Sequence, residues 1–401
     1  MIFSPRRKTQ APQGRYTPTL WPVWLVAPLA LVVVSALSFG LYHGVYYLLS
    51  GSANAQRPPK PLDVSDVIKT TVTVLTLVGA VLAGIYAYRK QLLAEGDAHR
   101  ADASQLADRY TAAAEQLGHQ QAAVRLAGVY ALARLADDWE EQRQVCTDVL
   151  CAYLRMPYSP DPTAEEHKAG EREVRHTIIR VIRDHLQDPD ATTSWCQFDF
   201  DFTGAIFDGG DLSRSIFRGR VSFVDSVFRG GRVTFNGAEF PASSLVSFNR
   251  AHFDSGTVTF RGVRFSGSAV SFDSARFNGG TVDFERAYFN DGMVTFHHAQ
   301  LDSGTVSFFR AGFKGGTVFF GPAQFNGGSV TFNMARFEGG TVSFDLGQFS
   351  GSAVSFDSAQ FRGGAVSFER AHFNGSTVTF NNAQFNGSAV EWGALPLPAG
   401  A

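Results

Sequence analysis

The stretch FNGGTVDFERAYF, residues 277–289, contains the pattern that decides the fold of this 401-residue chain. Near-copies of it recur through the second half of the chain as a 12-residue unit, V-x-F-x-x-A-x-F-x-G-G-T. In V-x-F and A-x-F the two apolar side chains lie on one face of a short strand, and Gly supplies the positive φ angle that a tight corner needs. The unit therefore predicts a β-solenoid whose strands stack about 4.8 Å apart.

The inward residues of the units form two series of large apolar side chains, separated by steps of five and then seven residues. A 12-residue circuit has too little interior room for two Phe, a Val and an Ala, so we expect a four-sided coil of two units, or 24 residues, and about seven coils. Each buried Phe stabilises such a core by about 1.5–3 kcal/mol. The predicted core ladder is Phe248, Phe253, Phe260, Phe265, Phe272, Phe277, Phe284, Phe289, Phe296, Phe308, Phe332, Phe356 and Phe380.

The spacing is shorter just before these units. Phe202, Phe207, Leu212 and Phe217 lie five residues apart, with a small residue two positions before each of the last three. This pattern resembles the pentapeptide-repeat proteins, in which four pentads form one square coil of a right-handed β-helix. The resemblance implies the same handedness for residues 198–392. Because of the seven-residue steps, the cross-section could be an elongated rectangle instead of a square.

Two apolar segments precede the repeats. Residues 21–49 and 70–88 contain no Asp, Glu, Lys or Arg, and about 20 apolar residues are enough to cross a bilayer. Four basic residues precede the first segment and three follow the second, against three in or near the loop between them. The positive-inside rule then places both termini in the cytoplasm. We therefore expect a multi-pass protein of the cell membrane, with the bilayer as one partner and a cytoplasmic repeat domain.

Residues 90–190 are predicted to form a helical module. Apolar residues recur there at helical spacing, in the three sets Leu126, Val129, Tyr130 and Ala133; Cys146, Val149, Leu150 and Tyr153; and Val174, Ile178, Val181 and Ile182. The stretch RYTAAAEQLGHQQAAVRLAGVYALARLADDW, residues 109–139, is similar to a segment that precedes the repeats in membrane-anchored pentapeptide-repeat proteins of actinobacterial type. That resemblance covers residues 109–155 and 200–392 and implies the same layout of membrane anchor, helices and repeats.

The fold class that results is α+β multidomain. Its predicted parts are a basic tail at 1–18, transmembrane helices at 19–50 and 70–89, a loop at 51–69, the helical module at 90–190, the solenoid at 198–392 and a tail at 393–401.

Few residues in the sequence suggest a catalytic or ligand-binding site. No catalytic or phosphate-binding motif stands in a suitable context, so no catalytic, cofactor-binding or metal site is predicted, and no cofactor. His297 and His298 are interpreted as solvated surface. Cys146 and Cys151 could form a redox pair, but Cys146 lies on an apolar stripe, which favours a buried hydrophobic role. A net charge of −2 gives no signature of nucleic-acid binding.

The repeats present similar groups many times, whereas catalysis needs dissimilar groups assembled once. The sequence therefore predicts a non-catalytic, membrane-tethered scaffold that binds a protein partner. A membrane-associated sensor or signal relay is the first alternative, and an enzyme is the third possibility. Mimicry of DNA to modulate a topoisomerase would need an acidic face, but residues 198–392 hold 17 acidic against 15 basic residues. Outward Thr pairs would suit an ice-binding face, but other residues interrupt them. A homo-oligomer is compatible with the sequence.

Overall fold

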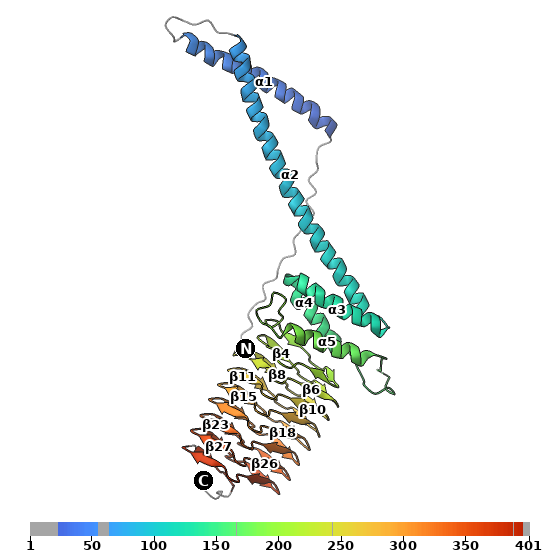
Figure 1. Ribbon diagram of the computed structural model, residues 1–401, viewed down its shortest axis with the longest axis vertical. Coiled ribbons are helices and arrows are strands. Elements are labelled where there is room, and N and C mark those ends of the chain that lie inside the picture. Colours follow the sequence, from blue (N-terminus) through green and yellow to red (C-terminus); the bar gives the residue numbers. More distant parts are fainter. Residues whose placement is uncertain (1–22, 55–63, 166, 243, 388, 396–401) are drawn as a thin grey trace. The chain divides into compact units, whose positions relative to one another are not determined.

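The computed structural model describes residues 23–54, 64–165, 167–242, 244–387 and 389–395 (Figure 1). They belong to two compact units, Met1–Asp102 and Ala103–Ala401. The predicted basic tail at 1–18 lies outside the described residues, and only the first three residues of the predicted C-terminal tail lie within them.

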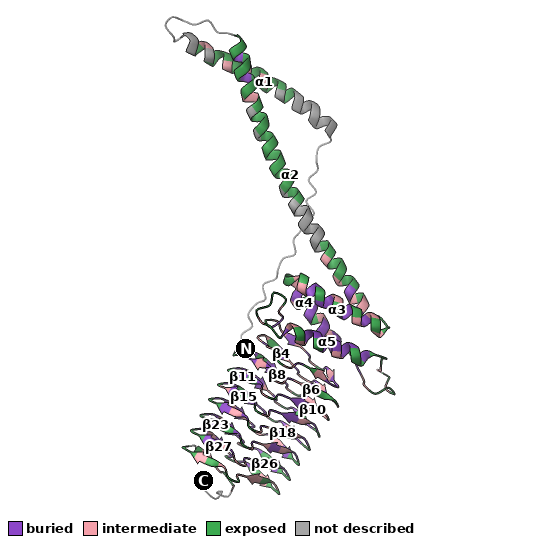
Figure 2. Ribbon diagram, viewed as in Figure 1, coloured by how far each residue is buried: buried purple, intermediate pink, exposed green. Residues whose placement is uncertain are grey.

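The two predicted membrane segments fall on helices α1 (Val23–Asn54) and α2 (Val64–Leu117). Over the residues that the structure describes, only Val64–Gln91 of α2 is long and apolar enough to cross a membrane, judged by length and composition. Its side chains are largely exposed, as the green of this segment in Figure 2 shows, and Leu82 is 61% exposed. Packing within the described protein therefore does not account for the apolar character of this helix.

The helical module of the second unit consists of the end of α2 and three further helices. They are α3 (Ala122–Asp138), α4 (Arg143–Leu154) and α5 (Glu171–His185), with a short 3-10 helix, η1 (Glu140–Gln142), between the first two. The buried residues of these helices appear purple in Figure 2. α4 contacts the first strand of the solenoid and α5 contacts the third, so the module closes the N-terminal end of the repeat domain.

The buried face of α3 agrees with the prediction at Val129 and Ala133 but differs at Tyr130. Tyr130, expected on the apolar stripe, is 48% exposed, whereas Gly128 and Leu132 are on the inner face. The reason is a close contact with α2, because a Cβ atom at Gly128 would lie 2.5 Å from the backbone nitrogen of Leu117. The absence of a side chain at one position thus sets which side of α3 faces α2, and counting large apolar residues could not show this.

Four parallel sheets, here named A to D, run along the solenoid. Sheet A contains β1 (Phe200–Asp201), β4 (Arg220–Ser222), β8 (Leu245–Ser247), β12 (Ala269–Ser271), β16 (Met293–Thr295), β20 (Thr317–Phe319), β24 (Thr341–Ser343), β28 (Ala365–Ser367) and β32 (Ala389–Glu391). Sheet B contains β2 (Ile206–Phe207), β5 (Val227–Phe228), β9 (His252–Phe253), β13 (Arg276–Phe277), β17 (Gln300–Leu301), β21 (Gln324–Asn326), β25 (Gln348–Ser350) and β29 (His372–Asn374).

The other two sheets complete each coil. Sheet C contains β3 (Gly210–Asp211), β6 (Arg232–Thr234), β10 (Thr257–Thr259), β14 (Thr281–Asp283), β18 (Thr305–Ser307), β22 (Ser329–Thr331), β26 (Ala353–Ser355) and β30 (Thr377–Thr379). Sheet D contains β7 (Glu239–Phe240), β11 (Arg264–Ser266), β15 (Tyr288–Asn290), β19 (Gly312–Lys314), β23 (Arg336–Glu338), β27 (Gln360–Arg362) and β31 (Gln384–Asn386). One 12-residue unit therefore supplies sheets A and B, and the next supplies C and D.

The strand register confirms a coil of 24 residues, since Val270 pairs with Val294. The pairing of Val221 with Val246 spans 25 residues, because one extra residue lies between Phe240 and Val246. The solenoid is of the right-handed type and has about eight coils rather than the seven predicted. The additional coil comes from the pentads that precede the 12-residue units, which continue the same sheets.

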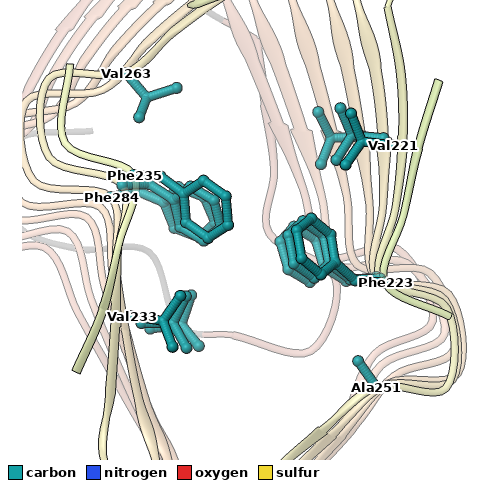
Figure 3. Packing of buried hydrophobic residues seen from close by; sticks show 14 of the residues in the cluster. Val221, Phe223, Val233, Phe235, Ala251, Val263 and Phe284 are labelled. Carbon is teal, nitrogen blue, oxygen red and sulfur yellow. The ribbon is translucent and has the colours of Figure 1, made fainter. Parts of the chain in front are cut away.

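The core consists of Phe columns in which each ring stacks on its counterpart one coil away. Phe272 and Phe296, which follow strands β12 and β16 of sheet A, have ring centroids 4.8 Å apart and nearly parallel planes. Across the core, Phe272 meets Phe284, which follows strand β14 of sheet C, edge to face, at 5.9 Å and 90°. Figure 3 shows the two columns from which these rings come, with Val side chains beside them. Both geometries are favoured ones for aromatic pairs.

The corners of the coil are of two kinds. At one kind, Gly adopts a positive φ, as Gly279 does at 90°, which agrees with the predicted role of the Gly pairs. At the other, the residue just before the small inward residue has a positive φ although it carries a side chain, as in Arg286 (56°) and Leu346 (61°). The sequence did not indicate these turns, because such residues rarely adopt this conformation.

Candidate functional site

A buried carboxylate, Asp208, joins the helical module to the first coil. Its Oδ2 accepts hydrogen bonds from the hydroxyl of Tyr158 (2.7 Å) and from Nε of Arg172 (3.0 Å). Its Oδ1 lies 2.9 Å from Nε2 of His176. Arg172 and His176 are four residues apart on α5 and so lie on the same face, while Tyr158 comes from the loop after α4. The Asp208 side chain therefore holds two other segments, α5 and the loop after α4, against the first coil.

The environment keeps the Asp208 carboxylate ionised. Burial by itself raises the pKa of this group, but hydrogen bonds from His176 and Tyr158, together with the nearby Arg172, outweigh that effect and hold the pKa below its ordinary value. Burial, and then the hydrogen bond to Asp208, raise the pKa of Tyr158. A protonated phenol and a carboxylate whose two oxygens already accept hydrogen bonds form a structural anchor, and neither is prepared to act as a nucleophile.

A second set of buried polar contacts extends this junction toward α3. Glu171 lies 3.2 Å from Nη2 of Arg125 and accepts a hydrogen bond from the Tyr153 hydroxyl at 2.9 Å. Arg175, whose pKa is lowered chiefly by burial, donates to the carbonyl of Ile206 at 3.1 Å and stacks on the ring of Tyr158. These contacts satisfy charged groups that would be costly to leave unpaired in the interior.

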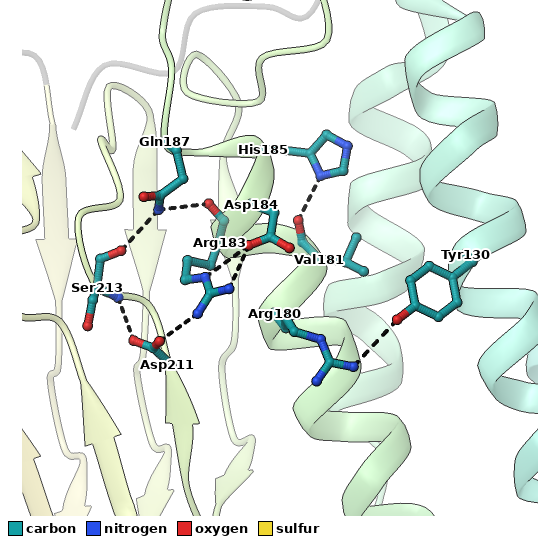
Figure 4. A network of polar contacts seen from close by, with 9 residues as sticks. All are labelled: Tyr130, Arg180, Val181, Arg183, Asp184, His185, Gln187, Asp211 and Ser213. Atoms are coloured by element: carbon teal, nitrogen blue, oxygen red, sulfur yellow. Dashed lines mark hydrogen bonds and ion pairs between the residues drawn. The ribbon is translucent and has the colours of Figure 1, made fainter.

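Figure 4 shows the more exposed side of the same junction. Arg183 on α5 forms an ion pair with Asp211 at 2.6 Å, and Gln187 donates a hydrogen bond to the carbonyl of Ser213 at 3.0 Å. The backbone nitrogen of Ile216 donates to the carbonyl of Leu186 at 2.8 Å. The module thus pairs with donors and acceptors of the first coil that would otherwise be left open, which protects this end of the solenoid from unwanted strand pairing.

Side-chain staples between successive coils are a feature that the sequence interpretation missed. The side chain of Asp345, which follows an inward Phe, accepts hydrogen bonds from the Ser367 hydroxyl (2.5 Å) and from the backbone nitrogen of Glu369 (2.9 Å). Asn333 makes the same pair of contacts with Ser355 and the nitrogen of Asp357. The signal was an Asn or Asp directly after an inward Phe, with Ser or Thr 22 residues later.

We expect the staples to contribute measurably to stability. Replacement of Asp345 by Ala removes the acceptor of two hydrogen bonds, at a cost of about 1–2 kcal/mol in the free energy of unfolding. The matched control is Asp302→Ala, because Asp302 is an exposed carboxylate whose side chain accepts one bond from Asn326. Chemical denaturation of the full chain in detergent compares the two, and equal losses would contradict a specific role for the staple.

The residues singled out for possible chemistry do not come together. The rings of His297 and His298 are 6.2 Å apart and tilted, and His297 packs on Phe319 at 4.6 Å. Burial raises the pKa of the thiol of Cys146 to about 11 and that of Cys151 to about 12. Within the part of the chain that the structure describes, no three His, Cys, Asp or Glu side chains are placed to hold a metal ion.

The structure places the predicted core ladder in the interior, with each member from Phe248 to Phe356 at most 1% exposed. Phe380, in the last coil, is only half-buried. Asp283, the last residue of β14, is only 7% exposed and forms an ion pair of 2.7 Å with Arg261.

Two of the hollows on the surface of the second unit have volumes above 600 Å³. One, of about 610 Å³, is formed by α2 and α3 and includes the exposed Tyr130 and Arg134. The other, which we name the corner groove, follows the edge between sheets C and D over five coils and has a volume of about 660 Å³. Its first part is lined by Arg286, Tyr288, Arg310, Gly312, Met334 and Arg336. Its second part is lined by Ser358, Gln360, Asn382 and Gln384.

Comparison with known proteins agrees with this geometry. No curated protein matches the chain. Residues 202–246 match the family model described as pentapeptide repeats (9 copies), and this segment covers most of the first coil and the start of the 12-residue units. Since the sheets of the matched segment continue through the later units without interruption, the chain contains a β-solenoid of the pentapeptide-repeat type.

Proposed function

We propose that this protein is a non-catalytic scaffold, tethered to a membrane, that binds a protein partner through the outward surface of its solenoid or its helical module. The observation that carries the proposal is the contrast between the two sides of each strand. Inward positions hold Phe, Val and Ala in nearly every coil, whereas outward positions differ between coils. A rigid surface of this kind loses little conformational freedom when a partner binds.

The apolar part of α2 supports the membrane tether. Val64–Gln91 has 28 residues, which at about 1.5 Å per residue exceed the thickness of a hydrocarbon core of about 30 Å. The predicted span on α1 would complete a hairpin with both ends in the cytoplasm. We expect the full chain to stay with the membrane fraction after extraction with alkaline carbonate. Its recovery in the soluble fraction would contradict the tether.

Affinity capture tests the scaffold. The full chain, cross-linked in native membranes and purified, is expected to bring down a protein in a defined ratio. Substitutions in the corner groove or in the hollow beside Tyr130 should reduce the yield and so locate the binding surface. Capture of no protein by the intact chain would contradict the proposal, and so would turnover of a small substrate by the pure protein.

A signal relay is the second candidate, and one observation favours it. α2 continues as a helix to Leu117, and both Ala113 and Leu117 are buried in the helical module. A change at the membrane would then reach the close contact at Gly128. Hydrogen exchange of α3 in bilayers of different thickness tests this, since a pure scaffold should show no difference.

A further inference from the structure

We infer that the corner groove is a docking site for an acidic peptide segment in extended conformation. The inference deepens the proposed function and rests on it, because it names the surface and the chemical class of the partner. It is carried by an uneven distribution of charge along the groove. The arginines lie together at one end, and neutral polar side chains line the other.

The three arginines of the groove form few ion pairs with carboxylates of the protein itself. Arg336 and Arg310 make no ion pair within 4.0 Å with any described residue, and Arg310 instead stacks on Phe309. Arg286 comes within 3.9 Å of Glu285, whose other oxygen faces Arg261. Elsewhere on the solenoid, pairs such as Arg250 with Asp225 approach to 2.6 Å. The groove arginines therefore remain available to carboxylates from outside.

The floor of the groove is set by a missing side chain. Gly312 lies between Tyr288 and Arg336 in the register of sheet D, and a Cβ atom there would lie 3.6 Å from the ring of Tyr288. In the two coils that follow the coil of Arg336, the same position holds Gln360 and Gln384. Tyr288 is 50% exposed and Met334 43% exposed, so the arginine end also offers apolar contact. Tyr and Arg are among the residues that most often anchor protein interfaces.

The length of the groove suits a short peptide. Five coils give four steps of about 4.8 Å, or about 19 Å in all, which an extended chain covers with about six residues. Carboxylates at one end would pair with the arginines. The amide side chains of Gln360, Asn382 and Gln384 could hydrogen-bond to the peptide backbone at the other end.

A nucleic acid fits this surface less well. Its charge is uniform along its length, so phosphates would lie over the uncharged end of the groove. Single-stranded nucleic acids also need successive aromatic side chains for stacking, and Tyr288 is the one aromatic residue in the lining. Just outside the groove, Lys314, Glu338 and Arg362 alternate in sign on neighbouring strands, which does not extend the basic surface.

The test uses residues that the chain itself places at equivalent positions, so that the coils should stay intact. The groove variant combines Arg286→Ser, Arg310→Asn and Arg336→Gln, copied from Ser358, Asn382 and Gln360. The control variant removes three exposed arginines on other faces in the same way, by Arg229→Asn, Arg276→Gln and Arg370→Ser. A third variant, Gly312→Gln, fills the groove without a change of charge.

Fluorescence anisotropy of labelled peptides measures binding to the full chain in detergent. The probes are Asp-Thr-Asp-Thr-Gln-Thr, its reverse, the same peptides with Asn for Asp, and oligothymidylate. We expect one acidic peptide to bind, with affinity that falls as salt rises and is roughly tenfold or more weaker in the groove variant. Gly312→Gln should also weaken it, while the control variant should not. No peptide binding, equal binding by the groove variant or the Asn peptides, or tighter binding of oligothymidylate would overturn the inference.

Capture from membranes with the same variants separates this inference from the proposed function. If the groove variant captures the partner as well as the intact chain does, the groove is not the docking site, and the scaffold proposal still stands. Peptide binding without any captured protein would overturn the scaffold and leave the groove as a binding site.

Discussion

Replacement of Phe308 by Ala is expected to lower the free energy of unfolding by about 3–5 kcal/mol. The ring is fully buried, stacks on Phe284 at 4.9 Å and on Phe332 at 4.7 Å, and meets the edges of Phe296 and Phe320 at 6.3 Å. Its removal leaves a cavity bordered by these rings and by Phe289 and Phe313, at 6.0 and 5.9 Å, all of which belong to the same coil or to a neighbouring one. The structure therefore has little freedom to close the gap.

The matched control is the next residue. The side chain of Phe309 points outward and is half-buried, and the guanidinium carbon of Arg310 lies 5.0 Å from the centre of the Phe309 ring. Phe309→Ala should cost no more than about 1 kcal/mol. Solenoids can unfold in parts, so hydrogen exchange of β18 and its neighbours should accompany chemical denaturation. Similar losses for the two variants would show that the Phe columns do not hold the coils together as described.

Replacement of Asp208 by Ala is expected to cost about 2–4 kcal/mol, because Tyr158 loses a partner in a buried place and His176 loses one in a half-buried place, at about 1–3 kcal/mol for a fully buried group. Arg172 contributes less, since its side chain is 64% exposed. Hydrogen exchange should rise in α5 and in β1 to β3, where the module joins the first coil. Asp211→Ala removes an exposed ion pair from the same corner and should cost less than about 1 kcal/mol. An equal effect of the two substitutions would contradict the role of Asp208 as the anchor.

The contribution of Asp208 should also depend on pH. Because its pKa is lowered in the folded protein, the stabilisation is complete above the unfolded value of about 3.9 and is lost as the pH falls through the lower folded value. The difference in unfolding free energy between wild type and Asp208→Asn should therefore be constant near neutral pH and shrink in strong acid. A difference that grew on acidification would refute the stated direction.

The sequence predicted the core of the solenoid well because every inward position is repeated. Val270 and Phe272 recur with the same neighbours in each coil, so local spacing alone shows which side chains share a face. The staple of Asp345 could be recognised only after the coil length was known, since its partner Ser367 lies 22 residues away. The contact between Tyr158 and Asp208 joins segments 50 residues apart that share no pattern, and no periodicity could reveal it.

The sequence predicted the packing of the helices less well than the core of the solenoid. On α3 the prediction relied on large apolar residues and placed Tyr130 inside, whereas Gly128 decides the orientation through a close backbone approach. A single Gly inside a helical pattern carries little information, because the pattern does not show which backbone approaches it. The corner groove was also missed, because its arginines lie 24 and 26 residues apart and come together only when coils stack.

The coil is built from two interchangeable halves, and this has a consequence for how the protein can change over evolutionary time. The segment FSGSAVSFDSA occurs at 265–275 and again at 349–359, seven units later, which is three and a half turns of the solenoid. Its AVS therefore stands in β12 of sheet A the first time and in β26 of sheet C the second. Gain or loss of a single unit would leave the Phe columns continuous while moving every later outward side chain to the opposite flank. Copy number can thus reassign binding surfaces without disturbing the interior.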